Sequence, residues 1–222
     1  MIIVDVKTYV EESSDPWSLK KVGVDKRRLE IIKKYLSGKG LVLDLGCAFG
    51  TYTDIISSIG NTAIGIDFSE RMVHDASEKF PKNTFLKADA TKLPFDCSVF
   101  DCVLLMGTAI YIRDKTVMFK EINRILKPKG IVCIIERNRL SPWHLIAEKL
   151  RKESAVDKIS DFIDIKQMKF LLAETGFRIR KISGDELSLP FFSRNRLTRK
   201  FFWRFGEIMP SASNFIVIIA EK

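Results

Sequence analysis

The chain has 222 residues, of which 46% are hydrophobic and 29% are charged, and this composition excludes an intrinsically disordered protein. No apolar run approaches the ~20 residues needed to cross a bilayer, and the N-terminus lacks the basic-then-apolar pattern of a signal peptide, so we expect one cytoplasmic domain over residues 1–222. The net charge is +9, and residues 136–222 contribute +6 of it, which fits either an anionic partner or a solvated basic surface.

Apolar runs of strand length alternate with helical patterns through the first 135 residues. We expect helices at 26–36, 50–59, 70–80 and 115–126, and strands at 40–45, 62–67, 83–88, 100–106 and 131–135. The helix at 115–126 carries an apolar stripe suited to packing on a sheet, made of Val117, Phe119, Ile122, Ile125 and Leu126. The proline and glycine within 127–130 end it. Repeated units of this length predict a parallel sheet with helices on both faces.

The remainder of the chain has a different texture. A helix is expected at 165–175, followed by strands at 177–182 and 214–220. Residues 1–37 form an N-terminal arm and helix, and the segments 137–164 and 189–213 are interpreted as insertions that cover the substrate.

The most informative stretch is the turn after the first expected strand. Asp44, Gly46 and Gly50 follow the spacing Asp-x-Gly-x-x-x-Gly, which places glycine where a ligand lies against the backbone and a helix begins. A nicotinamide-dinucleotide enzyme would carry Gly-x-Gly-x-x-Gly, so that alternative is disfavoured. An acid at this place suits a ligand with a cationic amino group.

Two further acids stand at strand ends. Asp67 closes the second expected strand, where a carboxylate can accept both hydroxyls of a ribose; the alternative is a cap on the following helix. Asp89 follows the third expected strand, where it can accept from an exocyclic adenine amine while the backbone N–H of Ala90 reaches a ring nitrogen. The alternative for Asp89 is a structural turn.

Several motifs in order resemble class I S-adenosylmethionine (SAM)-dependent methyltransferases, in particular the small-molecule enzymes of ubiquinone and menaquinone biosynthesis. The resemblance is carried by the stretches 42–47, 65–69, 88–95, 100–103, 125–130 and 173–177. In the fifth of these, Lys129 replaces a glycine of the family's Leu-Lys-Pro-Gly-Gly turn.

The resemblance implies a Rossmann-like sheet of seven strands, mostly parallel, with an antiparallel last strand. It also implies SAM as cofactor and S-adenosylhomocysteine (SAH) as product, with Asp44 and Gly46 at the methionyl end, Asp67 on the ribose and Asp89 on the adenine. The other expected cofactor-binding residues lie beside these and are Cys47, Gly50, Phe68, Ala90 and Met106.

The residues that act on the acceptor are harder to predict. Tyr111 follows the fourth expected strand at the position where many quinone-biosynthesis-type relatives have histidine, and it is interpreted as a residue that orients the acceptor, or as a packing residue. With a reference pKa near 10, a tyrosine is a poor base. His144 titrates near neutrality and is a candidate base beyond the fifth strand. The four cysteines form no C-x-x-C pair, so no metal site is expected.

Residues 191–206 contain four arginines and one lysine with no acid, and aromatic residues recur among them. This pattern is typical of a helix that contacts an anionic membrane or covers a lipid-like acceptor, although a helix docked on the sheet edge or a nucleic-acid contact would share it.

These observations predict a SAM-dependent methyltransferase acting on a small lipid-, quinone- or sugar-like molecule. Two alternatives stay open: an RNA methyltransferase that uses the basic second half, and a SAM-binding protein without catalysis.

Overall fold

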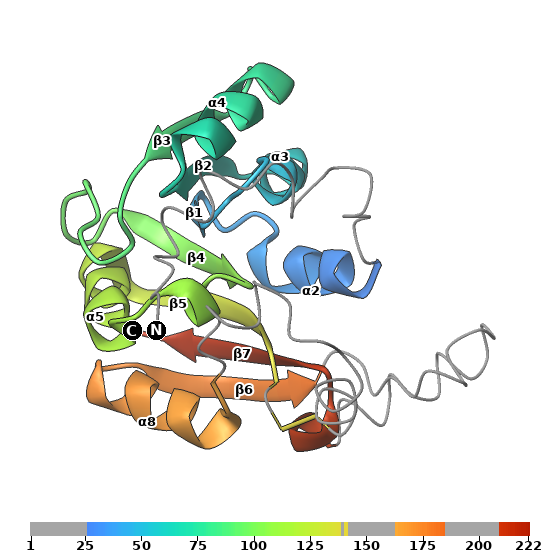
Figure 1. Ribbon diagram of the computed structural model, residues 1–222, viewed down its shortest axis with the longest axis vertical. Helices are drawn as coiled ribbons and strands as arrows, with labels where there is room; N and C mark the ends of the chain where they lie inside the picture. The colour runs from blue at the N-terminus through green and yellow to red at the C-terminus, as the bar shows by residue number, and fades with distance from the viewer. Residues whose placement is uncertain (1–25, 139, 142–162, 185–208) are drawn as a thin grey trace, which may run out of the picture.

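A single mixed sheet organises the protein. The computed structural model describes residues 26–138, 140–141, 163–184 and 209–222 (Figure 1). Its seven strands lie in the order β3-β2-β1-β4-β5-β7-β6. All neighbouring pairs from β3 to β5 are parallel, whereas β7 runs antiparallel to both β5 and β6. The expected Rossmann-like sheet, with its antiparallel last strand, is therefore confirmed.

The element boundaries agree closely with the expected ones. The strands are β1 (Leu41–Leu45), β2 (Thr62–Asp67), β3 (Thr84–Lys87), β4 (Phe100–Met106), β5 (Leu126–Arg137), β6 (Arg178–Gly184) and β7 (Phe215–Glu221). The helices are α2 (Lys26–Leu36), α3 (Thr51–Ser58), α4 (Glu70–Lys79), α5 (Lys115–Ile125) and α8 (Ile165–Glu174), with short 3-10 turns η1 (Ala109–Tyr111) and η2 (Pro210–Ala212).

Helices cover both faces of the sheet because alternate strand residues point to opposite sides. On one face, Leu43 and Val103 share a buried cluster with Phe119 of α5 and Leu172 of α8. On the other face, Val42 and Leu104 pack with buried residues of α2 and α3. The α4 helix packs beside β2 and β3 (Figure 1).

The turn before the fifth strand differs from the expectation. Leu126 already pairs with Phe100 of β4, and the next pair is Cys102 with Ile131. The intervening residues therefore bulge out of the ladder, and β5 begins earlier than predicted. Lys129 adopts φ +64° in this bulge, a left-handed conformation that glycine adopts without strain.

The stripe predicted for α5 is wrong at Val117, which is 37% exposed. Met118 is fully buried and takes its place beside Phe119 and Ile122. These three positions follow the helical spacing of one face, and Val117 lies just beyond its border.

Several predictions fall outside the described residues, namely those for the N-terminal arm, His144 and the segment 191–206. None of the helices in the described part of the chain has the length and apolar character that crossing a membrane would require. Within the same ranges, no group of three His, Cys, Asp or Glu side chains could hold a metal ion.

Candidate functional site

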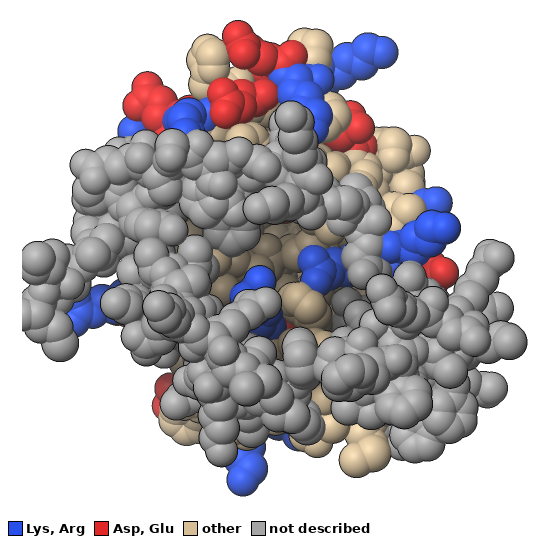
Figure 2. Space-filling model, turned by 45° about the vertical axis from the view of Figure 1, so that its right-hand side comes forward, with Lys and Arg blue, Asp and Glu red and all other residues tan. Residues whose placement is uncertain are grey.

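The predicted site residues gather at the carboxyl edge of the parallel strands. The chain continues from β1 to β2 on one side and reaches β4 on the other, so the sheet changes winding direction between β1 and β4. Ligands of open α/β sheets bind at such a switch point. Figure 2 brings forward the side of the molecule toward which the β4 arrow points in Figure 1; in the middle of this view the described surface is mostly uncharged, with Lys and Arg side chains beside it.

Asp44 lies on β1, one residue before the strand ends, and its side chain is only 2% exposed. Its Oδ2 accepts a 2.6 Å hydrogen bond from the hydroxyl of Thr53 in α3. Burial raises the pKa of Asp44 to about 6, and the nearby charge of Asp67 adds to this. With this pKa the carboxyl group loses its proton close to neutral pH, and its buried negative charge would then attract a cation.

The turn after β1 is compact and partly strained. The backbone N–H groups of Gly46 and Cys47 both donate to the carbonyl of Ile66. Gly46 and Gly50 have φ +80° and +73°, and Ala48 between them has φ +45°. A non-glycine residue at positive φ is strained, so this loop holds a conformation that its neighbours must enforce.

Asp67 helps to enforce it. Its Oδ2 accepts from the backbone N–H of Ala48 at 2.9 Å, and its Oδ1 accepts from Ser69 N–H at 3.0 Å. Burial raises the pKa of Asp67 above its ordinary value. The alternative in which Asp67 caps the following helix is wrong, because the Ser69 hydroxyl is the cap of α4 and accepts from Met72 N–H.

Asp89 belongs to a tight turn just beyond β3. Its Oδ1 accepts from both the backbone N–H and the hydroxyl of Thr91, at 2.8 and 2.7 Å. The predicted alternative, in which Asp89 stabilises a turn, is therefore confirmed. In this turn the Asp89 carboxylate lies at the same sheet edge as Asp67. Ala90 beside it is buried, at 7% exposure.

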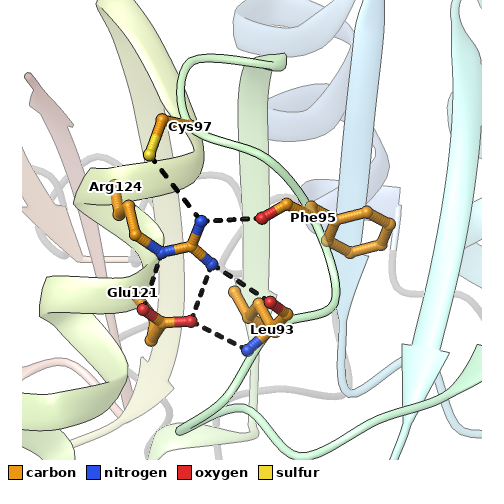
Figure 3. A network of polar contacts seen from close by, with 5 residues as sticks. All are labelled: Leu93, Phe95, Cys97, Glu121 and Arg124. Atoms are coloured by element: carbon orange, nitrogen blue, oxygen red, sulfur yellow. Dashed lines mark hydrogen bonds and ion pairs between the residues drawn. The ribbon is translucent and has the colours of Figure 1, made fainter.

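The loop that follows this turn is clamped to α5 by two charged residues (Figure 3). The Arg124 guanidinium donates to the carbonyls of Leu93 and Phe95, and Glu121 accepts from Leu93 N–H. Arg124 also pairs with Glu121 at 2.8 Å. The clamp fixes the path of the chain after Ala90, and the sequence analysis missed both of its residues.

Replacing Arg124 by methionine is expected to lower the free energy of unfolding by about 2–3 kcal/mol, because two partly buried carbonyls lose their donor. Chemical denaturation measures this change. Arg178→Met provides the matched control, since the Arg178 side chain is 68% exposed and, within the described ranges, forms an ion pair with Glu221 alone; its loss should cost less than about 1 kcal/mol. Equal effects of the two substitutions would contradict a clamp.

The loop after β4 is the predicted acceptor side of the site. Met106 ends the strand, and Gly107 has φ +65° with no atom of the described part of the chain within 4 Å of where a Cβ would stand. Tyr111 ends the turn η1 in the same loop and is half-buried. The backbone N–H groups of Thr108 and Ala109 both donate to Glu136 of β5. Glu136 was also missed, although an acid closing the apolar run Ile131–Ile135 was the available signal.

The sheet order and the acids at three successive strand ends beside a glycine turn define the class I methyltransferase architecture. A family model described as "Methyltransferase domain" matches residues 43–134. The chain is also 30% identical over 185 residues to a demethylmenaquinone methyltransferase of Lactococcus lactis, covering 70% of this chain and 73% of that protein. It therefore belongs to the family of SAM-dependent methyltransferases that contains these quinone-biosynthesis enzymes.

Two further similarities agree with this placement. The chain is 35% identical over 119 residues to a demethylmenaquinone methyltransferase of Staphylococcus aureus, where the match spans about half of each protein, 50% of this chain and 49% of the other. A SAM-dependent methyltransferase of Thermotoga maritima, described as a possible histamine N-methyltransferase, shares the fold with a TM-score of 0.72 and 24% identity, over 89% of this chain and 88% of that one. These comparisons give no support to the RNA-methyltransferase, dinucleotide-enzyme or non-catalytic alternatives.

Proposed function

We propose that the chain transfers a methyl group from SAM to a small aromatic acceptor of the quinol type. The observation that carries this proposal is the arrangement of Asp44, Asp67 and Asp89 at the ends of three neighbouring strands, next to the Gly46 turn. The relatives named as demethylmenaquinone methyltransferases support the acceptor class.

The chemistry of these side chains fits the cofactor. A carboxylate has about four lone-pair sites, and backbone N–H groups, among them those of Ala48 and Ser69, use part of those of Asp67. The lone pairs that they leave can accept ribose hydroxyls. Asp44 would attract the amino group of the methionyl part near Gly46, Cys47 and Gly50, while Asp89 and Ala90 would hold the adenine. Phe68 and Met106 would supply apolar contacts.

Asp44 makes SAH binding depend on pH. A folded-state pKa raised from 3.8 to about 6 contributes stability that is present below pH ~4 and is lost as the pH rises through 6. A bound ammonium group favours the ionised form, so affinity should increase with pH. We expect SAH to bind about tenfold more tightly at pH 7 than at pH 5, as measured by calorimetry.

Asp44→Asn tests the origin of this dependence. The variant should bind SAH weakly and without the increase from pH 5 to 7, and its ligand-free form should unfold at a higher temperature than the wild type at pH 7. 5′-Methylthioadenosine, which has no amino group on its side chain, should show no contribution from Asp44. An unchanged pH dependence in the variant would contradict this role.

The cofactor supplies an electrophilic methyl group when it is bound, so the main task of the chain is to hold the acceptor in line and exclude water. Tyr111 is proposed to hydrogen-bond the acceptor from the loop after β4. Tyr111→Phe is expected to lower kcat at least fivefold while the Kd for SAH changes less than twofold. Unchanged turnover would remove Tyr111 from the reaction. His144 stays a candidate base and lies outside the described residues.

The test of the proposed activity is a methyl-transfer assay with the purified full chain. Radiolabelled SAM is combined with a dithionite-reduced 2-prenylated 1,4-naphthoquinone, with 2,3-dimethylated naphthoquinol and with bulk RNA as controls. Label in the first compound alone supports a quinol acceptor with a free ring position. Binding of SAH without label in this compound would contradict the acceptor class, and label in RNA would favour the nucleic-acid alternative.

Membrane contact is a separate proposal. A cytoplasmic enzyme with a lipid-like acceptor would gain from residues 191–206, whose basic and aromatic side chains suit an anionic surface. This segment lies outside the described residues. Co-sedimentation with anionic but not neutral vesicles would support the contact, and equal recovery with both would contradict it.

A further inference from the structure

Glu136 is a buried acid that is not among the expected cofactor-binding residues. It lies near the end of β5, its side chain is 1% exposed, and its Oε1 accepts from Thr108 N–H and Ala109 N–H, both at 2.8 Å. Its Oε2 is buried and has no hydrogen-bond partner among the residues that the structure describes. Burying a carboxylate with one unsatisfied oxygen costs free energy. A neutral acceptor could bind the two amides at a lower cost, which indicates that the negative charge of Glu136 has a role of its own.

The two amides belong to the segment that separates the cofactor turn from the acceptor side. The Thr108 hydroxyl donates to the carbonyl of Leu45 at 3.0 Å, and the Thr108 side chain occupies the space beside Gly46. Three residues further on, Tyr111 N–H donates back to the Thr108 carbonyl. Thr108 therefore connects the end of β1 with the turn that carries Tyr111.

We infer that Glu136 is a positioning residue for methyl transfer, whose carboxylate holds residues 107–111 against the Gly46 turn and so sets the placement of the acceptor relative to the cofactor. This inference rests on the proposed function. The carboxylate acts through backbone amides, so it stabilises the loop whatever the side chains of Thr108 and Ala109 contact.

The charge state of Glu136 connects this role to pH. Burial raises its pKa to about 7, against the opposing effects of the two amides, of Lys115 at the start of α5 and of the adjacent Arg137. Of these two cations Lys115 has the larger effect, and it donates to the carbonyl of Ile112. Charge-assisted hydrogen bonds are the stronger ones, so the loop is held most firmly when Glu136 is ionised, above pH 7.

The pH dependence of the overall stability has the opposite sign to that of the loop contacts. A folded-state pKa raised from 4.5 to about 7 contributes stability below pH ~4.5 that is lost as the pH rises through 7. Glu136→Gln should therefore unfold at a higher temperature than the wild type at pH 8, while its loop is held less firmly. This combination separates a positioning role from a purely structural one.

The experiment compares Glu136→Gln, Glu136→Leu and the control Glu78→Gln, whose side chain is 72% exposed on α4. Hydrogen exchange is followed at the amides of Thr108 and Ala109 in the SAH-bound full chain at pH 8. We expect exchange at least tenfold faster in Glu136→Leu, a smaller increase in Glu136→Gln, and no change in the control. Equal protection in all four proteins would overturn the inference.

Turnover of the naphthoquinol provides the second readout. The kcat of the wild type should rise between pH 6 and 8, and Glu136→Gln should lose the part of this rise centred near pH 7. Glu136→Leu should lose at least tenfold in kcat with the Kd for SAH changed less than threefold. A Glu136→Leu variant with wild-type kcat would overturn the inference. A wild type that binds SAH but methylates no quinol would contradict the proposed function, and the exchange result would still decide the role of Glu136.

Discussion

Replacing Asp67 by asparagine is expected to weaken SAH binding at least 100-fold. Asparagine has a single acceptor oxygen, so it cannot serve Ala48 N–H, Ser69 N–H and two ribose hydroxyls together. Each charge-assisted hydrogen bond contributes about 1.5–3 kcal/mol, and every ~1.4 kcal/mol corresponds to a factor of ten. Calorimetry at pH 8 measures the loss.

The control for this prediction is Asp75→Asn, which changes a half-exposed acid of α4 and should leave SAH affinity within twofold of the wild type. Thermal unfolding of both variants shows whether the ligand-free fold persists. An Asp67→Asn protein that is folded and binds SAH within threefold of the wild type would contradict the ribose contact.

Gly46→Ala is expected to lower the free energy of unfolding by about 3 kcal/mol or more and to abolish measurable SAH binding. Left-handed backbone costs an alanine about 1–2 kcal/mol, and at Gly46 the new Cβ would also collide with the Thr108 side chain. Gly107→Ala is the matched control, because Gly107 has a similar φ of +65° and no described residue lies within 4 Å of the added methyl group. Gly107→Ala should therefore cost only the ~1–2 kcal/mol of the left-handed backbone conformation.

The double variant Gly46→Ala, Thr108→Ala separates the two causes. Removing the hydroxyl and methyl groups of Thr108 relieves most of the collision but not the strain in the backbone, so the double variant should recover part of the lost stability in urea denaturation. If Gly46→Ala and Gly107→Ala were equally destabilising, close packing between Gly46 and Thr108 would not be what requires a glycine.

Most of the fold was predictable because the strands are short apolar runs that end at turn residues. The same logic located Asp44, Asp67 and Asp89, since carboxyl ends of parallel strands meet at one edge. The bulge before β5 was not predicted, because a register shift between Phe100 and Cys102 depends on the neighbouring strand. The prediction placed Val117 in the buried stripe of α5, but Val117 lies just outside that stripe, next to the buried Met118.

The residues that the sequence analysis missed act across long separations in the chain. Glu136 and Thr108 are 28 positions apart, and Arg124 reaches Leu93 across 31. Neither contact follows from local periodicity or turn chemistry, because each requires knowing which strand ends and loops face one another. Each acid at a strand end could be predicted from its own place in the sequence. The residues that hold the surrounding loops could not, because predicting them requires knowing both partners of a contact.

The most direct measurement of the central claim is a crystal structure of the full chain with SAH. We predict density for SAH along the carboxyl edge from β1 to β3, with its methionyl part beside Gly46 and both ribose hydroxyls within hydrogen-bonding distance of the Asp67 carboxylate. SAH bound elsewhere, or a ribose that makes no contact with Asp67 in this cleft, would contradict the assignment of the site.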